Sequence, residues 1–150
     1  MEDRVYREAL SVAIKHIGIA AYSSGKIFTY LTDKGFPEDI AFKVVSELTE
    51  RQYINDHKAS RKVLIARTGK KQESRDYIHK RLLAAGIAPD VADDVVSSLP
   101  PDNETCLGLF NSLGFEEDSE EARNEMIDTA IKRGYNYETA SAAYSVWSEM

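Results

Sequence analysis

The sequence predicts an all-α fold of three tandem three-helix repeats that form an elongated, curved helical array. Sliding the 150-residue chain by 51 positions aligns residues 23–48 with residues 74–99, and ten of the 26 aligned positions are identical. Such self-similarity at a fixed period is typical of repeat architectures. Apolar residues in these segments recur three and four positions apart, as on one face of a helix, and no segment shows the sustained alternation of a strand.

Each aligned segment begins with a helix that a glycine is expected to end. In the first copy, Ser23 is a suitable N-cap because its hydroxyl can accept a hydrogen bond from an unpaired backbone N–H. Ile27 and Leu31 follow on one helix face, and Gly35 can adopt the left-handed conformation that ends a helix. The second copy repeats this pattern, and a weaker third copy has Gly134 at the glycine position.

A further helix follows each of these glycines. Proline stands at its expected start in two copies, Pro37 and Pro89, where the missing backbone N–H costs nothing. Each of these helices has one apolar stripe. The stripes are Ile40, Ala41, Val44, Val45 and Leu48; Val91, Ala92, Val95, Val96 and Leu99; and Ala140, Ala143, Tyr144 and Trp147.

Each aligned segment is also preceded by a helical stretch, at about residues 3–20, 55–68 and 102–112, which gives nine helices in all. The predicted repeats are residues 1–54, residues 55–99, which are basic, and residues 100–150, which are acidic. A three-helix unit of this size cannot bury its apolar faces alone, so we expect neighbouring units to stack.

The formal net charge of −6 hides opposite charges in different parts of the chain. Residues 89–150 contain 3 basic and 14 acidic side chains, whereas residues 57–88 are strongly basic. The basic residues of that segment are Lys58, Arg61, Lys62, Arg67, Lys70, Lys71, Arg75, Lys80 and Arg81, against the acidic Glu73 and Asp76. We predict that these nine cations form a binding patch for DNA phosphate or for an acidic protein surface. The alternative is a helix face that is merely solvated.

The sequence lacks the residue patterns of an enzyme, so we expect no catalytic residue, metal or cofactor. The single Cys106 excludes an internal disulfide, and neither Cys-x-x-Cys nor His-x-x-x-His spacing occurs. Cys106 is expected to be a small buried hydrophobe, and Tyr135 to be partly exposed. We predict a cytoplasmic protein without a membrane segment, because no apolar stretch is long enough to cross a bilayer.

Several motifs in this order resemble the RecX family of regulatory proteins, which modulate the RecA recombinase. The resemblance covers about residues 8–148. The matching segments are Tyr22-Ser23-Ser24-Gly25-Lys26-Ile27, Lys34-Gly35-Phe36, Leu48-Thr49-Glu50-Arg51-Gln52-Tyr53-Ile54-Asn55-Asp56, Ile78-His79-Lys80-Arg81-Leu82-Leu83-Ala84-Ala85-Gly86-Ile87 and Lys132-Arg133-Gly134-Tyr135-Asn136-Tyr137-Glu138.

The resemblance implies a regulator that binds the RecA recombinase and its filament on DNA. It would inhibit recombination, ATP hydrolysis and co-protease activity, and thereby modulate DNA repair, homologous recombination and the SOS response. We expect a monomer whose basic second repeat contacts single- or double-stranded DNA. The alternative function is a helical-repeat module for DNA binding or protein–protein interaction, with no recombinase partner.

Overall fold

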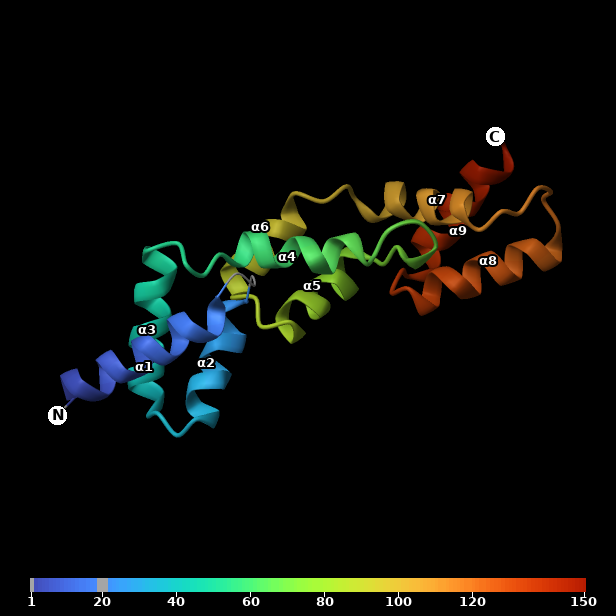
Figure 1. The fold of residues 1–150 in the computed structure, drawn as a ribbon. Coiled ribbons are helices and arrows are strands. Elements are labelled where there is room, and N and C mark those ends of the chain that lie inside the picture. Colours follow the sequence, from blue (N-terminus) through green and yellow to red (C-terminus); the bar gives the residue numbers. More distant parts are fainter. Residues whose placement is uncertain (1, 19–21) are drawn as a thin grey trace. The chain divides into compact units, whose positions relative to one another are not determined.

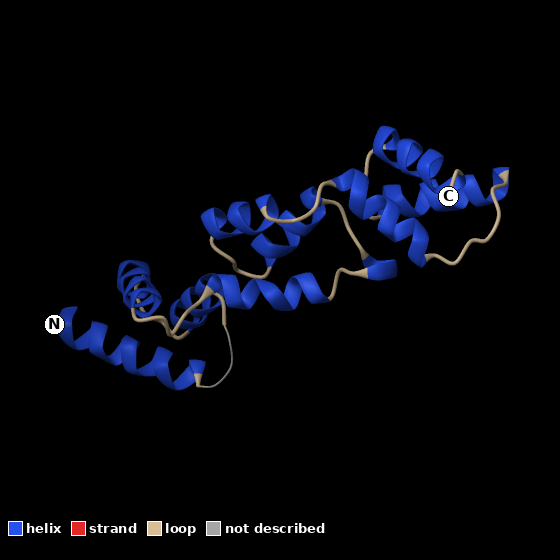
Figure 2. Ribbon diagram, turned by 90° about the horizontal axis from the view of Figure 1, so that it is seen from above, coloured by secondary structure: helices blue, strands red, loops and turns tan. Residues whose placement is uncertain are grey.

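The computed structural model describes residues 2–18 and 22–150, which form nine α-helices and one short 3₁₀ helix (Figure 1). The elements are α1 (Glu2–Ile17), α2 (Ser24–Asp33), α3 (Glu38–Glu50), α4 (Asp56–Ile65), η1 (Gly69–Lys71), α5 (Arg75–Ala84), α6 (Pro89–Ser97), α7 (Asp102–Ser112), α8 (Glu120–Lys132) and α9 (Tyr137–Ser148). No strand occurs in these two described ranges (Figure 2). The predicted all-α class is therefore confirmed, and the grouping into three repeats stays a prediction.

The helix ends predicted from capping residues are found where the sequence places them. The hydroxyl of Ser23 accepts a hydrogen bond from the Lys26 backbone N–H at 3.3 Å. The glycines at the ends of α2, α5 and α8, Gly35, Gly86 and Gly134, have φ of 96°, 85° and 95°. A residue with a Cβ atom is strained at such angles, so these glycines allow the chain to leave each helix.

Two of the predicted first helices are shorter than expected, whereas α7 spans the expected residues 102–112. The helix expected over residues 55–68 ends at Ile65, and the chain turns through Gly69, which has φ of 60°, into η1. The helix expected over residues 3–20 ends at Ile17, and Gly18 follows with φ of 49°. The remainder of that prediction, from residue 19 on, lies outside the described residues.

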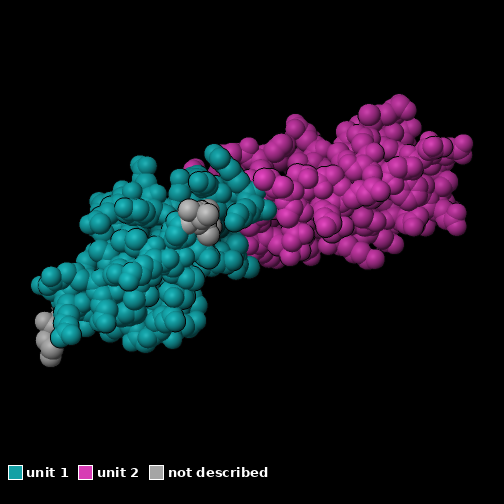
Figure 3. Space-filling model, viewed as in Figure 1, with its two compact units in different colours: residues 1–62, 82–93 teal, residues 63–81, 94–150 magenta. Residues whose placement is uncertain are grey.

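The chain divides into two compact units (Figure 3). Unit 1 contains residues 1–62 and 82–93, and unit 2 contains residues 63–81 and 94–150. Residues of α4, α5 and α6 are therefore shared between the units.

The core of unit 1 lies among α1, α2 and α3, which pack on one another. Its buried side chains are Ala9, Ala13, Ile17, Ile27, Leu31, Ile40, Ala41, Val44, Leu48 and Ile54. These include the apolar positions predicted for the first repeat, except Val45, which is half-buried. Removing this apolar surface from water is the main force that holds the three helices together.

The core of unit 2 lies among α7, α8 and α9. Its buried side chains are Cys106, Leu109, Phe110, Ala122, Met126, Ile127, Ala130, Tyr135, Ala140, Ala143 and Tyr144, with Trp147 packed against them. The prediction that Cys106 is a buried hydrophobe is confirmed, because none of its surface is exposed. Burial raises the pKa of its thiol to about 12, with a smaller contribution from the charge of Asp102.

Candidate functional site

A buried carboxylate in unit 1 lies directly before the basic segment and fixes the start of α4. Asp56 begins α4 and is 7% exposed. Its carboxylate accepts hydrogen bonds from the backbone N–H of Ser24 at 2.8 Å, from the hydroxyl of the same residue at 2.6 Å, and from the N–H of Ala88 at 2.9 Å. Three donors satisfy a buried carboxylate and hold it in one orientation. The start of α4 is therefore anchored to the start of α2.

The first three predicted binding cations lie on the outer side of α4. Ala59 and Ser60 are buried, whereas Lys58, Arg61 and Lys62 are exposed. Residues three and four positions apart are neighbours on a helix surface, so the three cations form one stripe. This part of the patch is accessible to a phosphate backbone or to an acidic protein.

Unit 2 presents two more exposed cations on a short turn. Lys70 and Lys71 lie in η1, which packs against α7. The hydrogen bond from the Lys71 N–H to the Thr68 carbonyl, at 3.1 Å, helps to close this turn.

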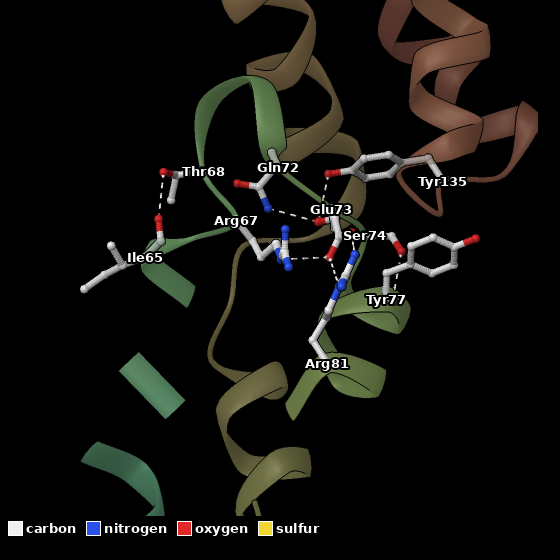
Figure 4. A network of polar contacts seen from close by, with 9 residues as sticks. All are labelled: Ile65, Arg67, Thr68, Gln72, Glu73, Ser74, Tyr77, Arg81 and Tyr135. Atoms are coloured by element: carbon white, nitrogen blue, oxygen red, sulfur yellow. Dashed lines mark hydrogen bonds and ion pairs between the residues drawn. The ribbon is translucent and has the colours of Figure 1, made fainter. Parts of the chain in front are cut away.

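Two of the predicted cations instead bind a buried carboxylate within unit 2 (Figure 4). Glu73 is 2% exposed and lies between the guanidinium groups of Arg67 and Arg81. The Arg81 Nη2 and Nε atoms donate to its two carboxylate oxygens at 2.9 and 3.2 Å, and the Arg67 Nε lies 3.6 Å from Oε1. The hydrogen bond with Glu73, and then its negative charge, raise the pKa of Arg81. Both arginines therefore have an internal partner for their charge.

Arg75 also makes internal contacts. Its guanidinium donates to the carbonyl of Pro100 at 3.2 Å and to the carbonyl of Leu99. Its backbone N–H donates to the Asp102 carboxylate at 2.9 Å. Arg75 thus ties the start of α5 to the residues around the start of α7.

Lys80 is exposed, but an acidic neighbour partly compensates its charge. Its ammonium lies 3.4 Å from Asp76, and this pair is exposed on both sides. The ammonium also lies 5.4 Å from the centre of the Tyr77 ring. Exposed pairs of this kind hold the ammonium weakly, so it can still turn to another partner.

The structure thus separates the nine predicted site residues into two groups. Lys58, Arg61, Lys62, Lys70, Lys71 and Lys80 are exposed. Arg67, Arg75 and Arg81 bind a buried carboxylate or backbone carbonyls within unit 2, although the Arg81 side chain is still 47% exposed. A binding role for each of the nine stays a prediction.

Sequence reasoning missed Glu73 and misjudged Tyr135. The expectation that Tyr135 is partly exposed is wrong, because only 2% of its surface is exposed. Its hydroxyl donates to the Glu73 carbonyl at 3.1 Å (Figure 4). It also shares a hydrogen bond with the Thr105 hydroxyl at 2.8 Å. Burial raises the pKa of the Tyr135 hydroxyl. The available signal for Glu73 was its position as one of two acidic residues in the basic segment, directly before Ser74, whose hydroxyl caps α5.

The described residues hold no group of three or more His, Cys, Asp or Glu side chains arranged to bind a metal ion. Of the helices within residues 2–18 and 22–150, none combines the length and the hydrophobicity needed to cross a membrane.

Comparison with known proteins finds similar sequences that share one name. No protein-family model matches the chain. The regulatory protein RecX of Leuconostoc citreum is 25% identical and matches 92% of this chain, and that of Prosthecochloris aestuarii is 24% identical and matches 93%. The RecX of Clostridium perfringens is 24% identical over 75% of the chain. The chain spans about half the length of the first and third relatives, 54% and 55%, and 93% of the second.

Solved structures with the same fold have the same name. The crystal structure of RecX from Lactobacillus salivarius has a TM-score of 0.76, with 99% of both chains covered and 15% sequence identity. A second crystal structure of a regulatory protein RecX has a TM-score of 0.65, covering 96% of this chain and 73% of the other at 16% identity. The comparisons agree with each other and with the motifs: the chain is similar to RecX proteins in sequence and has the fold of a RecX crystal structure.

Proposed function

We propose that this protein is a RecX-type regulator that binds the RecA filament on DNA and inhibits its recombination, ATPase and co-protease activities. The main support is the similarity to RecX proteins, which extends over more than nine-tenths of the chain in two relatives. A regulator of this kind acts by occupying a surface of the filament, and no catalytic residue of its own is needed for that. The cell process affected is DNA repair by homologous recombination, together with the SOS response, in the cytoplasm.

The exposed cations of α4 and η1 supply a physical basis for binding. Lys58, Arg61 and Lys62 form a stripe on one side of a helix whose first residue is anchored by hydrogen bonds. Lysine and arginine that neutralise phosphates release condensed counterions, so the resulting affinity falls steeply with salt. The same stripe attracts an acidic protein surface and speeds its encounter with the chain. We propose that the protein acts as a monomer through this stripe.

A second candidate function is a helical module that binds DNA or an acidic protein without a recombinase partner. The observation in its favour is the exposed stripe itself, because its cations suit any polyanion. Salt-sensitive binding to DNA without any effect on RecA would support this second function.

The test measures RecA-dependent ATP hydrolysis and strand exchange on single-stranded DNA with increasing amounts of the protein. We expect both activities to fall as the protein is added. The variant Lys58→Glu/Arg61→Glu/Lys62→Glu should lose this inhibition yet keep its thermal stability, because surface charges contribute little to folding. Activities that stay unchanged at a several-fold excess of the wild-type protein would contradict the proposal.

A matched control separates the stripe from net charge alone. The variant Arg4→Glu/Lys43→Glu/Lys132→Glu changes the net charge by the same amount at three exposed positions elsewhere. We expect this control to inhibit RecA almost as well as the wild type. Equal loss of inhibition in both variants would point to long-range charge rather than to the α4 stripe.

A further inference from the structure

Unit 2 contains a small cavity that residues of the basic segment help to line. Its volume is about 220 Å³, and its apolar walls are Leu64, Ile78, Leu99 and Pro100. Pockets for drug-sized molecules begin at about 300 Å³. This cavity is therefore too small for such a ligand and has the size of a single inserted side chain.

One polar atom of a lining residue lacks a hydrogen-bond partner. Arg67 lines the cavity, and its Nε atom is buried without a hydrogen-bond acceptor among the described residues. Its distance of 3.6 Å from the Glu73 carboxylate suits an ion pair but is too long for a hydrogen bond. The Glu73 carboxylate is therefore the partner for the charge of Arg67, and this guanidinium is not available to hold an incoming anion.

The chain next to this cavity is positively charged on its surface. Thr68 and Gln72 line the cavity, and the two exposed lysines of η1, Lys70 and Lys71, lie between them in the sequence. A partner that reaches the cavity is therefore close to two cations, which favour carboxylates on that partner.

The lining of the cavity argues against a phosphate group as its occupant. The Glu73 carboxylate that lines it already pairs with Arg67 and Arg81, so these guanidinium groups are not free to receive a phosphate. The apolar walls offer no hydrogen bonds, and Arg75 already donates to the carbonyls of Leu99 and Pro100. A strongly hydrated anion would lose water here without regaining its hydrogen bonds.

We propose that this cavity receives an aliphatic side chain from an acidic segment of a protein partner. The carboxylates of that segment lie near the exposed Lys70 and Lys71. The identification of the partner as the RecA filament rests on the proposed function, whereas the chemistry of the occupant rests on the cavity. Unit 2 thus recognises protein, and the α4 stripe of unit 1 remains available to DNA.

The first experiment tests the cavity without RecA. The full-length protein is titrated with the acetylated and amidated peptide Glu-Glu-Leu-Glu-Glu, while the methyl NMR signals of Leu64, Ile78 and Leu99 are followed. A control peptide has alanine in place of leucine. We expect the leucine peptide to shift these signals and the alanine peptide to bind about tenfold more weakly, because less apolar surface is buried.

The second experiment fills the cavity. Leu64→Trp and Leu99→Trp each occupy the space. Leu83→Trp is the control, because it places the same ring on an exposed leucine outside this cavity. We expect each cavity variant to bind the leucine peptide and the RecA filament about tenfold more weakly, as for the central anchor of an interface. Affinity for a single-stranded oligonucleotide should change less than about twofold, since the α4 stripe is intact.

The outcomes separate this inference from the proposed function. Equal binding of the two peptides, or full peptide binding by a folded Leu64→Trp variant, overturns the cavity proposal. Oligonucleotide that shifts the same methyl signals and displaces the peptide also overturns it, because the cavity would then serve nucleic acid. Should Leu64→Trp fail to fold, Leu99→Trp and the peptide pair still decide. Selective peptide binding without RecA inhibition would support the cavity proposal and contradict the proposed function. RecA inhibition without selective peptide binding would support the proposed function and contradict the cavity proposal.

Discussion

The hydroxyl of Ser23 donates a hydrogen bond at 2.7 Å to the carbonyl of Ala85, which lies 62 residues further along the chain. Gly86 follows at once, and its carbonyl accepts a hydrogen bond from the Gly25 N–H at 2.8 Å. The turn at Gly86 is thus hydrogen-bonded to the N-terminus of α2 within unit 1. Unit 2 contains a similar contact, in which the Ser74 N–H donates at 3.0 Å to the carbonyl of Arg133, next to Gly134. The contact between a helix N-terminus and a later glycine turn thus occurs in both units.

A Gly86→Ala substitution should destabilise the protein more than Gly35→Ala does. Both glycines have positive φ, so each alanine costs about 1 kcal/mol of backbone strain. A Cβ atom on Gly35 would have nothing within 4 Å, whereas one on Gly86 would lie 2.4 Å from the Ser23 Oγ and 3.0 Å from the Lys26 N. Gly86→Ala should therefore lower the free energy of unfolding by roughly 1–3 kcal/mol more than Gly35→Ala does. Urea unfolding of the two variants measures the difference. Equal losses of stability would show that the N-terminus of α2 moves to accommodate the added methyl group at no cost.

Neutralising Glu73 should strongly lower the free energy of unfolding. In Glu73→Gln, the guanidinium groups of Arg67 and Arg81 lose the carboxylate that lies between them. Removal of one member of a buried ion pair typically costs about 3–5 kcal/mol. Because the Arg81 side chain is 47% exposed and solvent screens its charge, we expect a smaller loss of about 2–3 kcal/mol here. Urea denaturation followed by circular dichroism measures it.

The control for this prediction is the exposed pair of Asp76 and Lys80. Their side chains are 73% and 68% exposed, so Asp76→Asn should change the stability by less than about 0.5 kcal/mol. A Glu73→Gln variant as stable as this control would contradict a stabilising role for the buried carboxylate.

Local patterns explain why much of the fold could be predicted from the sequence. The helix periods, the Ser23 N-cap and the terminal Gly35 depend on residues within a few positions of one another. The same periods predict which side chains are buried. Ile27 and Leu31 share one face of α2, and both are fully buried. These signals concern one helix or turn at a time, and the sequence displays them directly.

The internal contacts of the basic segment could not be predicted in this way. Arg81 lies eight residues from Glu73, and the Tyr135 hydroxyl contacts the Glu73 carbonyl across 62 residues. Neighbours on a helix surface touch at separations of three and four residues, so only the packing of unit 2 brings these groups together. The same packing engages Arg67 and Arg81 internally, although in sequence they resemble the exposed lysines nearby.

Loss of the Asp56 carboxylate should destabilise the protein and loosen the start of α4. Asp56→Ala leaves the Ser24 N–H, the Ser24 hydroxyl and the Ala88 N–H without their acceptor. Buried donors without partners cost about 1–3 kcal/mol each at most, and partial access to water should limit the total to about 2–4 kcal/mol. Amide hydrogen exchange should also rise at the two backbone donors.

Asp90→Asn provides the comparison for Asp56→Ala. Asp90 is an exposed acid in the first turn of α6, where its interaction with the helix dipole is worth less than about 1 kcal/mol. Equal stability of the two variants would mean that water replaces the Asp56 carboxylate without cost.

The Cys106 thiol should be almost inert in the folded protein. Its pKa is raised to about 12, first by burial and then by the charge of Asp102, and the thiol is therefore protonated at neutral pH. At pH 8 the thiolate fraction is about 1 in 10,000, and the thiolate is the form that attacks a disulfide reagent. The reaction with dithionitrobenzoate should therefore be slow, and urea should accelerate it because unfolding returns the thiol pKa to about 8.5.

An exposed thiol in the same protein calibrates this rate. Ala142 is exposed on α9, so Ala142→Cys in a Cys106→Ala background should react at the rate of an ordinary surface cysteine. A native Cys106 that reacted as fast as this control would show that the unit 2 core opens readily. A slow reaction that accelerates with urea in parallel with the loss of helical signal would instead mean that Cys106 is reached only through unfolding. The reaction rate would then report the stability of unit 2 rather than thiol chemistry.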